Sequence, residues 1–137
     1  MKIDLKADLT IRDIKTTFHE TFKFLKLEFF SDKKSKDIGF SKDLMIDNET
    51  SLQDLMHPFR EGSVHLTGKT TVKAFEHEWM EKFGLNVQVF RKSGLLYLET
   101  TSTDEWTLEQ QNNEGETASK LEAGEAPRDE LDRDQWE

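Results

Sequence analysis

Cysteine is absent from this chain of 137 residues, and the sequence has only two prolines and one tyrosine. Without cysteine the chain has no disulfide, no thiol nucleophile and no zinc site built on cysteine ligands. Long apolar runs are also missing, since none approaches the ~20 residues that a membrane helix needs. The N-terminal segment MKIDLKADLT lacks the apolar centre of a secretory signal. We therefore expect a cytoplasmic protein that spans no membrane.

Positive charge is scarce, and the imbalance is concentrated near the C-terminus. The chain has 19 lysines and arginines against 28 aspartates and glutamates, a net charge of −9. Residues 112–137 contribute −6 of that charge and show few apolar side chains and no helical stripe. Such a segment buries too little apolar surface to offset the entropy lost on ordering. We therefore predict a folded domain at 1–111 and a disordered acidic tail at 112–137, which either docks a partner through Trp136 or only aids solubility.

An internal repeat at an offset of 61 residues organises the predicted domain. Thr10 falls on Thr71 and Phe18 falls on Trp79, and after the extra Gly84 the offset becomes 60. The other matching apolar positions are Ile3, Leu5, Ile11, Ile14, Phe22, Leu25, Leu27 and Phe29 with Val64, Leu66, Val72, Phe75, Phe83, Leu85, Val87 and Val89. Because helical and strand patterns agree together, we predict a duplication, with repeat one at 1–60 and repeat two at 61–111.

Each repeat has the pattern of a strand, a helix and a second strand. Apolar residues alternate over 3–5 and 25–29 and recur with helical spacing over 11–22, and the second repeat has the same periods. A turn at 90–94 that contains a glycine then leads into an extra C-terminal hairpin strand at 95–99. This order predicts an α+β fold, most simply a ferredoxin-like two-layer sandwich with both helices on one sheet face. The alternative is two small α+β lobes packed about a pseudo-twofold axis.

The most distinctive segments are KLEFF at 26–30, EKFGLNVQVFRKSG at 81–94, LETT at 98–101 and DEWTL at 104–108. They resemble a family of small uncharacterised proteins of anaerobic gut bacteria, and the similarity covers much of 1–111. The resemblance implies a bacterial origin and a folded unit. It implies no activity, cofactor or functional residue.

Two segments resemble known phosphate-binding and metal-binding motifs, but each lacks a feature that the motif needs. The segment from Gly62 to Thr70 is close to a phosphate-binding loop, but it has five residues between its glycines where that loop needs four. His77 and Glu81 lie four residues apart on one helix face, yet two ligands are too few for a metal site. We therefore predict no catalytic residue, no cofactor and no metal.

The remaining signal is a surface formed by aromatic side chains. If the alternating aliphatic residues of the strands face the helices, Phe30, Phe90 and Tyr97 lie on the other, open face of the sheet, with Arg91 and Lys92 at its rim. An exposed apolar face of this kind marks protein contacts. We therefore predict a non-enzymatic protein-interaction module that binds an unknown protein partner or a second copy of itself.

The alternative function is the binding of single-stranded nucleic acid, because aromatic rings on an open sheet with basic edges also stack bases. The missing ribonucleoprotein signatures and the acidic net charge count against it. A further alternative is that residues 31–62 or the tail cover the face. An error of one residue in the strand register would exchange the two faces. A small hydrolase is supported by no motif.

Overall fold

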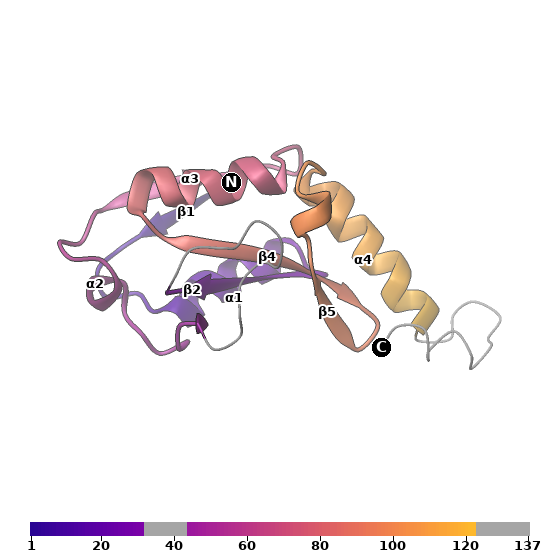
Figure 1. Cartoon of the computed structure of the whole chain (residues 1–137), viewed down its shortest axis with the longest axis horizontal. Coiled ribbons are helices and arrows are strands. Elements are labelled where there is room, and N and C mark those ends of the chain that lie inside the picture. Colours follow the sequence, from indigo (N-terminus) through magenta and orange to yellow (C-terminus); the bar gives the residue numbers. More distant parts are fainter. Residues whose placement is uncertain (32–43, 123–137) are drawn as a thin grey trace.

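The computed structural model describes residues 1–31 and 44–122 (Figure 1). It confirms the α+β class. The elements are β1 (Lys2–Leu5), α1 (Ile11–Thr21), β2 (Leu25–Phe30), α2 (Leu52–Leu55), β3 (Gly62–His65), α3 (Val72–Phe83), β4 (Asn86–Ser93), β5 (Leu96–Glu99), the 3-10 turn η2 (Thr101–Thr103) and α4 (Leu108–Glu122). None of the described helices is both long and apolar enough to cross a membrane.

The strands form two antiparallel sheets, one of two strands in the order β1-β3 and one of three strands in the order β2-β4-β5. The finer arrangement therefore differs from the single sheet of a ferredoxin-like sandwich. Each strand of the first repeat pairs with its counterpart in the second, with Ile3 opposite Val64 and Glu28 opposite Gln88. These pairs join residues that match at the offsets of 61 and 60. The pseudo-twofold relation of the two repeats stays a prediction.

The two long helices of the repeats begin in the same way. Thr10 closes a capping box with Asp13 at the start of α1, and Thr71 accepts a hydrogen bond from the third residue of α3. Each of these threonines also forms an isolated antiparallel β-bridge with a residue that caps a later helix. Thr10 pairs with Ser51, which caps α2, and Thr71 pairs with Thr107, which caps α4. The short α2 and the long α4 therefore occupy matching places after the strand–helix–strand unit of each half.

The connecting hydrogen bonds repeat as well. The amide of Leu52 donates to the carbonyl of Leu9, and the amide of Leu108 donates to the carbonyl of Thr70, both at 2.8 Å. Leu52 and Leu108 are both fully buried at these contacts. The two halves thus share a common set of contacts, while their origin by duplication stays a prediction.

One apolar core lies between the helices and the sheets, and both repeats contribute to it. Phe18 of α1 stacks on Phe75 of α3 with ring centroids 5.2 Å apart, and Trp79 meets Phe29 of β2 edge to face at 5.3 Å. The other buried members from the helices and strands are Ile3, Leu5, Ile11, Ile14, Leu25, Leu27, Leu52, Val64, Val72, Phe83, Val87, Val89 and Leu108. The helical and strand stripes of the sequence therefore face the core as predicted.

Helix α4 changes the predicted domain boundary. It continues through Glu122, so residues 112–122, which the sequence assigned to the disordered tail, are helical. Its buried stripe runs at helical spacing but consists of Leu108, Gln111, Gly115 and Ala118. A glycine, an alanine and an amide give no hydrophobic signal, so the sequence pattern alone does not indicate this part of the helix. Residues 123–137, with Trp136, lie outside the described residues.

Gly115 allows α4 to approach the sheet closely. A Cβ atom at this position would lie 2.9 Å from the Cβ of Phe24 and 3.1 Å from the carbonyl oxygen of Lys92. One turn earlier, the side chain of Asn112 accepts a hydrogen bond from the amide of Phe24 at 2.9 Å. The helix is therefore fixed against the backbone at the start of β2 and the end of β4.

Replacing this glycine tests the contact. In an open helix, Gly→Ala stabilises by about 1 kcal/mol, whereas we expect Gly115→Ala to destabilise the protein by about 1–3 kcal/mol, because the added methyl group forces α4 away from the sheet. Chemical denaturation monitored by circular dichroism measures the change. The control is Glu114→Ala on the exposed side of α4, which should change stability by no more than ~0.5 kcal/mol. A gain in stability for Gly115→Ala would contradict the close packing.

Candidate functional site

The three-stranded sheet has one face on the core and one face turned outward. Along β2, Leu25, Leu27 and Phe29 belong to the core, so Lys26 and Glu28 project from the other face. In the sheet register Lys26 lies opposite Phe90 on β4, and Lys92 lies opposite Tyr97 on β5. A groove of about 510 Å³ opens on this side. We call it the aromatic groove; it is lined by Lys26, Glu28, Phe30, Met45, Phe90, Leu95, Leu96, Tyr97, Leu98 and Glu99.

The structure brings together the three aromatic residues predicted from the sequence. Phe30, Phe90 and Tyr97 all line the aromatic groove. Phe30 is buried with only 3% of its surface exposed, so it forms part of the groove floor, while Phe90 and Tyr97 are half-buried. Lys92 lies at the edge, with its Nζ 5.9 Å from the centre of the Tyr97 ring.

Arg91 does not belong to this surface. Because it neighbours Phe90 on β4, the alternation of the strand turns its side chain to the opposite face. There its guanidinium group lies 5.6 Å from the centre of the Trp106 ring and donates a hydrogen bond to Oε1 of Gln111 at 2.9 Å. Arg91 therefore helps to hold α4 and the loop before it, and the predicted rim retains only Lys92.

Lys26 lines the aromatic groove, although it is not among the site residues predicted from the sequence. Its Nζ lies 5.4 Å from the centre of the Phe90 ring and 4.6 Å from the centre of the Tyr97 ring. A lysine at these distances is attracted by the faces of both rings. The sequence shows only that Lys26 is near the aromatic residues of its own strand, and the contact with two other strands depends on the register.

A buried carboxylate stands at the centre of the groove floor. Glu28 is 4% exposed and pairs with Lys15 at 2.7 Å and with Lys26 at 3.3 Å. Lys15 also donates to the side chain of Asn48 at 2.8 Å. These partners are necessary, because an isolated buried charge would be strongly unfavourable. The pairs also restrain Lys26, so the cation over the two rings has a defined position.

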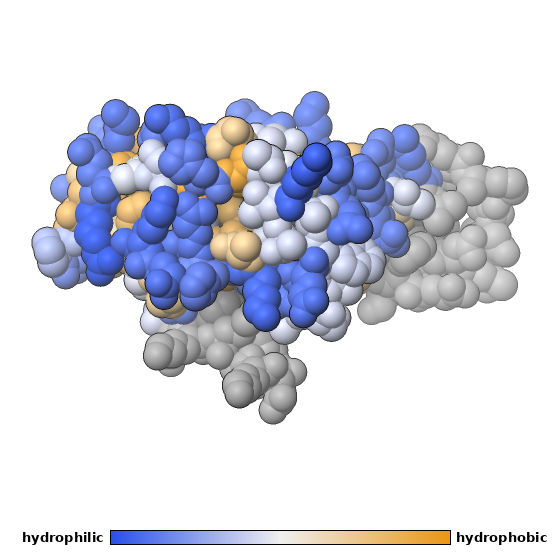
Figure 2. Space-filling model, turned by 90° about the horizontal axis from the view of Figure 1, so that it is seen from above, coloured by the Kyte–Doolittle hydropathy of each residue, from blue (hydrophilic) through white to orange (hydrophobic). Residues whose placement is uncertain are grey.

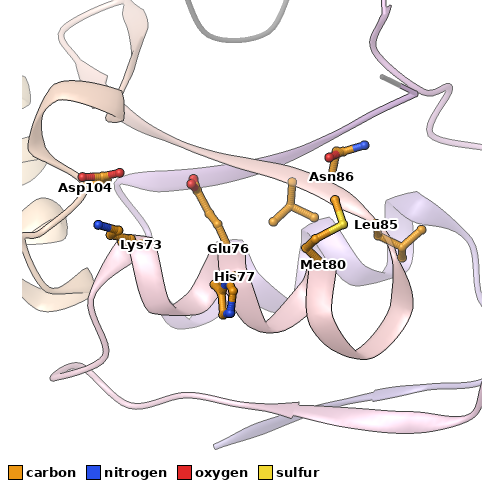
Figure 3. Close-up of a pocket in the computed structure, with 8 residues that line it drawn as sticks. Lys73, Glu76, His77, Met80, Leu85, Asn86 and Asp104 are labelled. Carbon is orange, nitrogen blue, oxygen red and sulfur yellow. The ribbon is translucent and has the colours of Figure 1, made fainter. Parts of the chain in front are cut away.

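A second, smaller cleft of about 310 Å³ lies between α3 and β4 (Figure 3). Figure 3 shows Glu76 pointing from α3 toward the strand, and its Oε2 accepts a hydrogen bond from the amide of Val89 at 2.9 Å. His77 lies 3.8 Å from Glu81, and both side chains are largely exposed. The carboxylate of Glu76 thus accepts a hydrogen bond from the backbone of β4, which gives this residue a structural role.

In the described residues, neither the segment from Gly62 to Thr70 nor the pair of His77 and Glu81 forms a binding site for a phosphate or a metal ion. Gly62 and Val64 belong to strand β3 and pair with β1, so the segment resembling a phosphate-binding loop is extended where that loop would need to curve. Within 1–31 and 44–122, no group of three or more histidine, cysteine, aspartate or glutamate side chains is placed to hold a metal ion. The surface above α3, seen in Figure 2, is mainly hydrophilic with small hydrophobic areas.

Tyr97 provides a spectroscopic reporter of the groove, because it is the only tyrosine in the chain. Partial burial raises the pKa of its hydroxyl group above the ordinary value of 10.0. The unfolded chain therefore loses this proton at lower pH than the folded protein. The stability that follows from the shift is complete below pH 10.0 and is lost as the pH rises through the raised pKa.

Absorbance titration of the phenolate tests this shift directly. We expect the folded protein to titrate with a midpoint above 10.0, and the same chain unfolded in urea to titrate at the ordinary value. Because one tyrosine gives the whole signal, no assignment is needed. A folded midpoint at or below that of the unfolded chain would contradict the burial of Tyr97 in the groove.

Comparisons of the chain with protein-family models, with curated proteins and with solved structures gave no match. The resemblance to proteins of gut bacteria therefore stays a prediction. The aromatic groove and the strands that form it are the features of the structure that bear on function.

Proposed function

We propose that this protein is a non-enzymatic protein-interaction module that binds an apolar segment of its partner in the aromatic groove. The observation that carries the proposal is the gathering of Phe30, Phe90 and Tyr97 on the outward sheet face, in a groove of about 510 Å³. Concave apolar surfaces of this size with a few placed polar groups are typical of binding sites.

The exposed apolar residues support the same surface. Leu95, in the turn before β5, is 84% exposed, and Leu96 and Leu98 of β5, whose side chains alternate with that of Tyr97, line the edge of the groove and are each 39% exposed. Met45, which is 37% exposed, lines the groove from the other side. Leaving these side chains in water is unfavourable, and covering them with a partner removes apolar area from water. Concentration of such residues around one groove favours a protein contact there.

The nucleic-acid alternative has less support. Lys26 already lies over the faces of Phe90 and Tyr97, where a stacking base would have to insert. The groove also presents the exposed carboxylate of Glu99, and Lys26 is already paired with Glu28. Together with a net charge of −9, these groups oppose a polyanion.

Selection of binders from a displayed library of random peptides tests the proposal. We expect selected peptides to be rich in apolar residues and to shift the NMR signals of Phe30, Phe90 and Tyr97. The double variant Phe90→Ser, Tyr97→Ser should weaken their binding by about thirtyfold or more, because aromatic anchors at the centre of an interface dominate affinity. The matched control is Trp106→Ser, which removes an exposed aromatic outside the groove and should leave affinity unchanged.

Two results would count against the proposal. Equal binding by the double variant and the native protein would show that the peptides bind elsewhere. Binding of single-stranded oligonucleotides at the same residues, with an affinity that falls steeply as salt is raised, would favour the nucleic-acid alternative. Circular dichroism of both variants checks that the fold is retained.

A further inference from the structure

Strand β5 is a short open edge whose one charged residue is Glu99. It is the outer strand of the three-stranded sheet, and its second edge pairs with no strand among the described residues. Natural edge strands are commonly protected by short length, charged side chains (lysine above all), proline or a bulge. The sequence of β5, Leu-Tyr-Leu-Glu, contains no lysine or proline, and both of its faces carry large apolar side chains. A strand that is apolar on both faces is typical of the inside of a sheet.

The hairpin determines which backbone groups face outward. Lys92 lies opposite Tyr97, and the amide of Lys92 donates to the carbonyl of Phe24, on the side of β2. Because hydrogen-bonded and non-hydrogen-bonded pairs alternate in an antiparallel ladder, Lys92 and Tyr97 form a non-hydrogen-bonded pair. The amide and carbonyl groups of Tyr97, and of Glu99 two residues on, therefore point to the open edge.

We propose that a second copy of this chain pairs with β5 in an antiparallel, twofold-symmetric dimer. The proposal rests on the interaction function proposed above, names a second copy as one partner, and adds the edge of β5 beside the aromatic groove as the contact surface. In the register we propose, Tyr97 lies opposite Glu99 of the partner subunit, and Leu98 lies opposite Leu98 of the partner subunit. This register places all the outward amide and carbonyl groups of both strands in hydrogen-bonded pairs. The two sheets join into one sheet of six strands.

Side-chain chemistry favours this pairing. Leu98 meets the same residue across the axis, so an apolar pair lies at the centre on one face. On the groove face, the cross-strand order becomes Lys26, Phe90, Glu99, Tyr97 of the partner subunit and Lys92 of the partner subunit. A carboxylate thus stands between two aromatic rings with a lysine beyond each ring, and no like charges lie directly opposite. The exposed leucines of β5 lose contact with water.

The net charge gives the dimer a characteristic salt dependence. Each chain has a charge of −9, so two copies repel each other at long range. Salt screens this repulsion and leaves the apolar and backbone contacts of β5 in place. We expect dimerisation to strengthen as salt is raised, and analytical ultracentrifugation over a range of protein concentrations should show a mass of twice 16.0 kDa.

Single cysteine variants test the register, since the native chain has no cysteine and any disulfide must join two copies. A non-hydrogen-bonded cross-strand pair places its Cα atoms about 4.5 Å apart, within the distance that a disulfide spans. Leu98→Cys should therefore form a disulfide-linked dimer under mild oxidation. Leu96→Cys is the control, because in this register the two copies of position 96 are ~13 Å apart along the strands.

A charge exchange at the same position provides a second test. Leu98→Lys and Leu98→Glu should each lose the dimer, because like charges then lie opposite each other at the axis. An equimolar mixture of the two variants should recover it. Thr16→Lys, on the exposed side of α1, adds the same charge away from the groove and β5 and should dimerise like the native chain. Circular dichroism confirms that each variant is folded.

The results that would overturn the dimer differ from the results that would overturn peptide binding in the aromatic groove. A native chain that stays monomeric at all concentrations and salts overturns the dimer, while loss of selected peptides from the Phe90→Ser, Tyr97→Ser variant would still support the interaction function. A dimer that survives Leu98→Lys and gives no disulfide with Leu98→Cys also overturns the proposal, because another surface then joins the subunits.

Discussion

The pairing of β2 with β4 in one fixed register is the constraint on which the rest of the structure depends. It places Glu28 opposite Gln88 and turns one set of side chains into the core and the other set outward. Because the side-chain period of a strand is two, a shift of one residue would send Phe29 and Val89 into water and Phe90 into the core. The groove and the core are thus two results of the same pairing.

Polar groups hold this register where apolar contacts alone would tolerate a shift. Glu28 is buried and forms ion pairs with Lys15 of α1 and with Lys26 of its own strand. A shift of β2 would therefore leave a buried charge without a partner. In the second half, Glu76 of α3 accepts a hydrogen bond from the amide of Val89 on β4. Each repeat therefore ties its helix to its second strand through a charged side chain. The consequence for function is a rigid floor beneath the aromatic groove.

Helix α4 extends this arrangement on the core side of the sheet. Its stripe of small and polar residues lets the helix lie close to the backbone at Phe24 and Lys92, with Gly115 at the tightest point. The contact between Arg91 and Trp106 continues the same attachment toward the end of β5. Apart from Met1, the large apolar residues left exposed in the described residues gather on and around β5, where both the groove and the open edge are found.

The sequence by itself determined the α+β class, the paired strand–helix–strand pattern and the faces of most elements, because periods of two and 3.6 residues are local properties of the chain. It also determined that Phe30, Phe90 and Tyr97 share a face. Tertiary structure alone decided the division into two sheets, since strand partners depend on contacts between residues far apart in the chain. It also decided the position of Lys26 over two rings and the attachment of Arg91 to α4. Small residues such as Gly115 add no hydrophobic signal to a sequence, so only their close contact with the backbone reveals that they are buried.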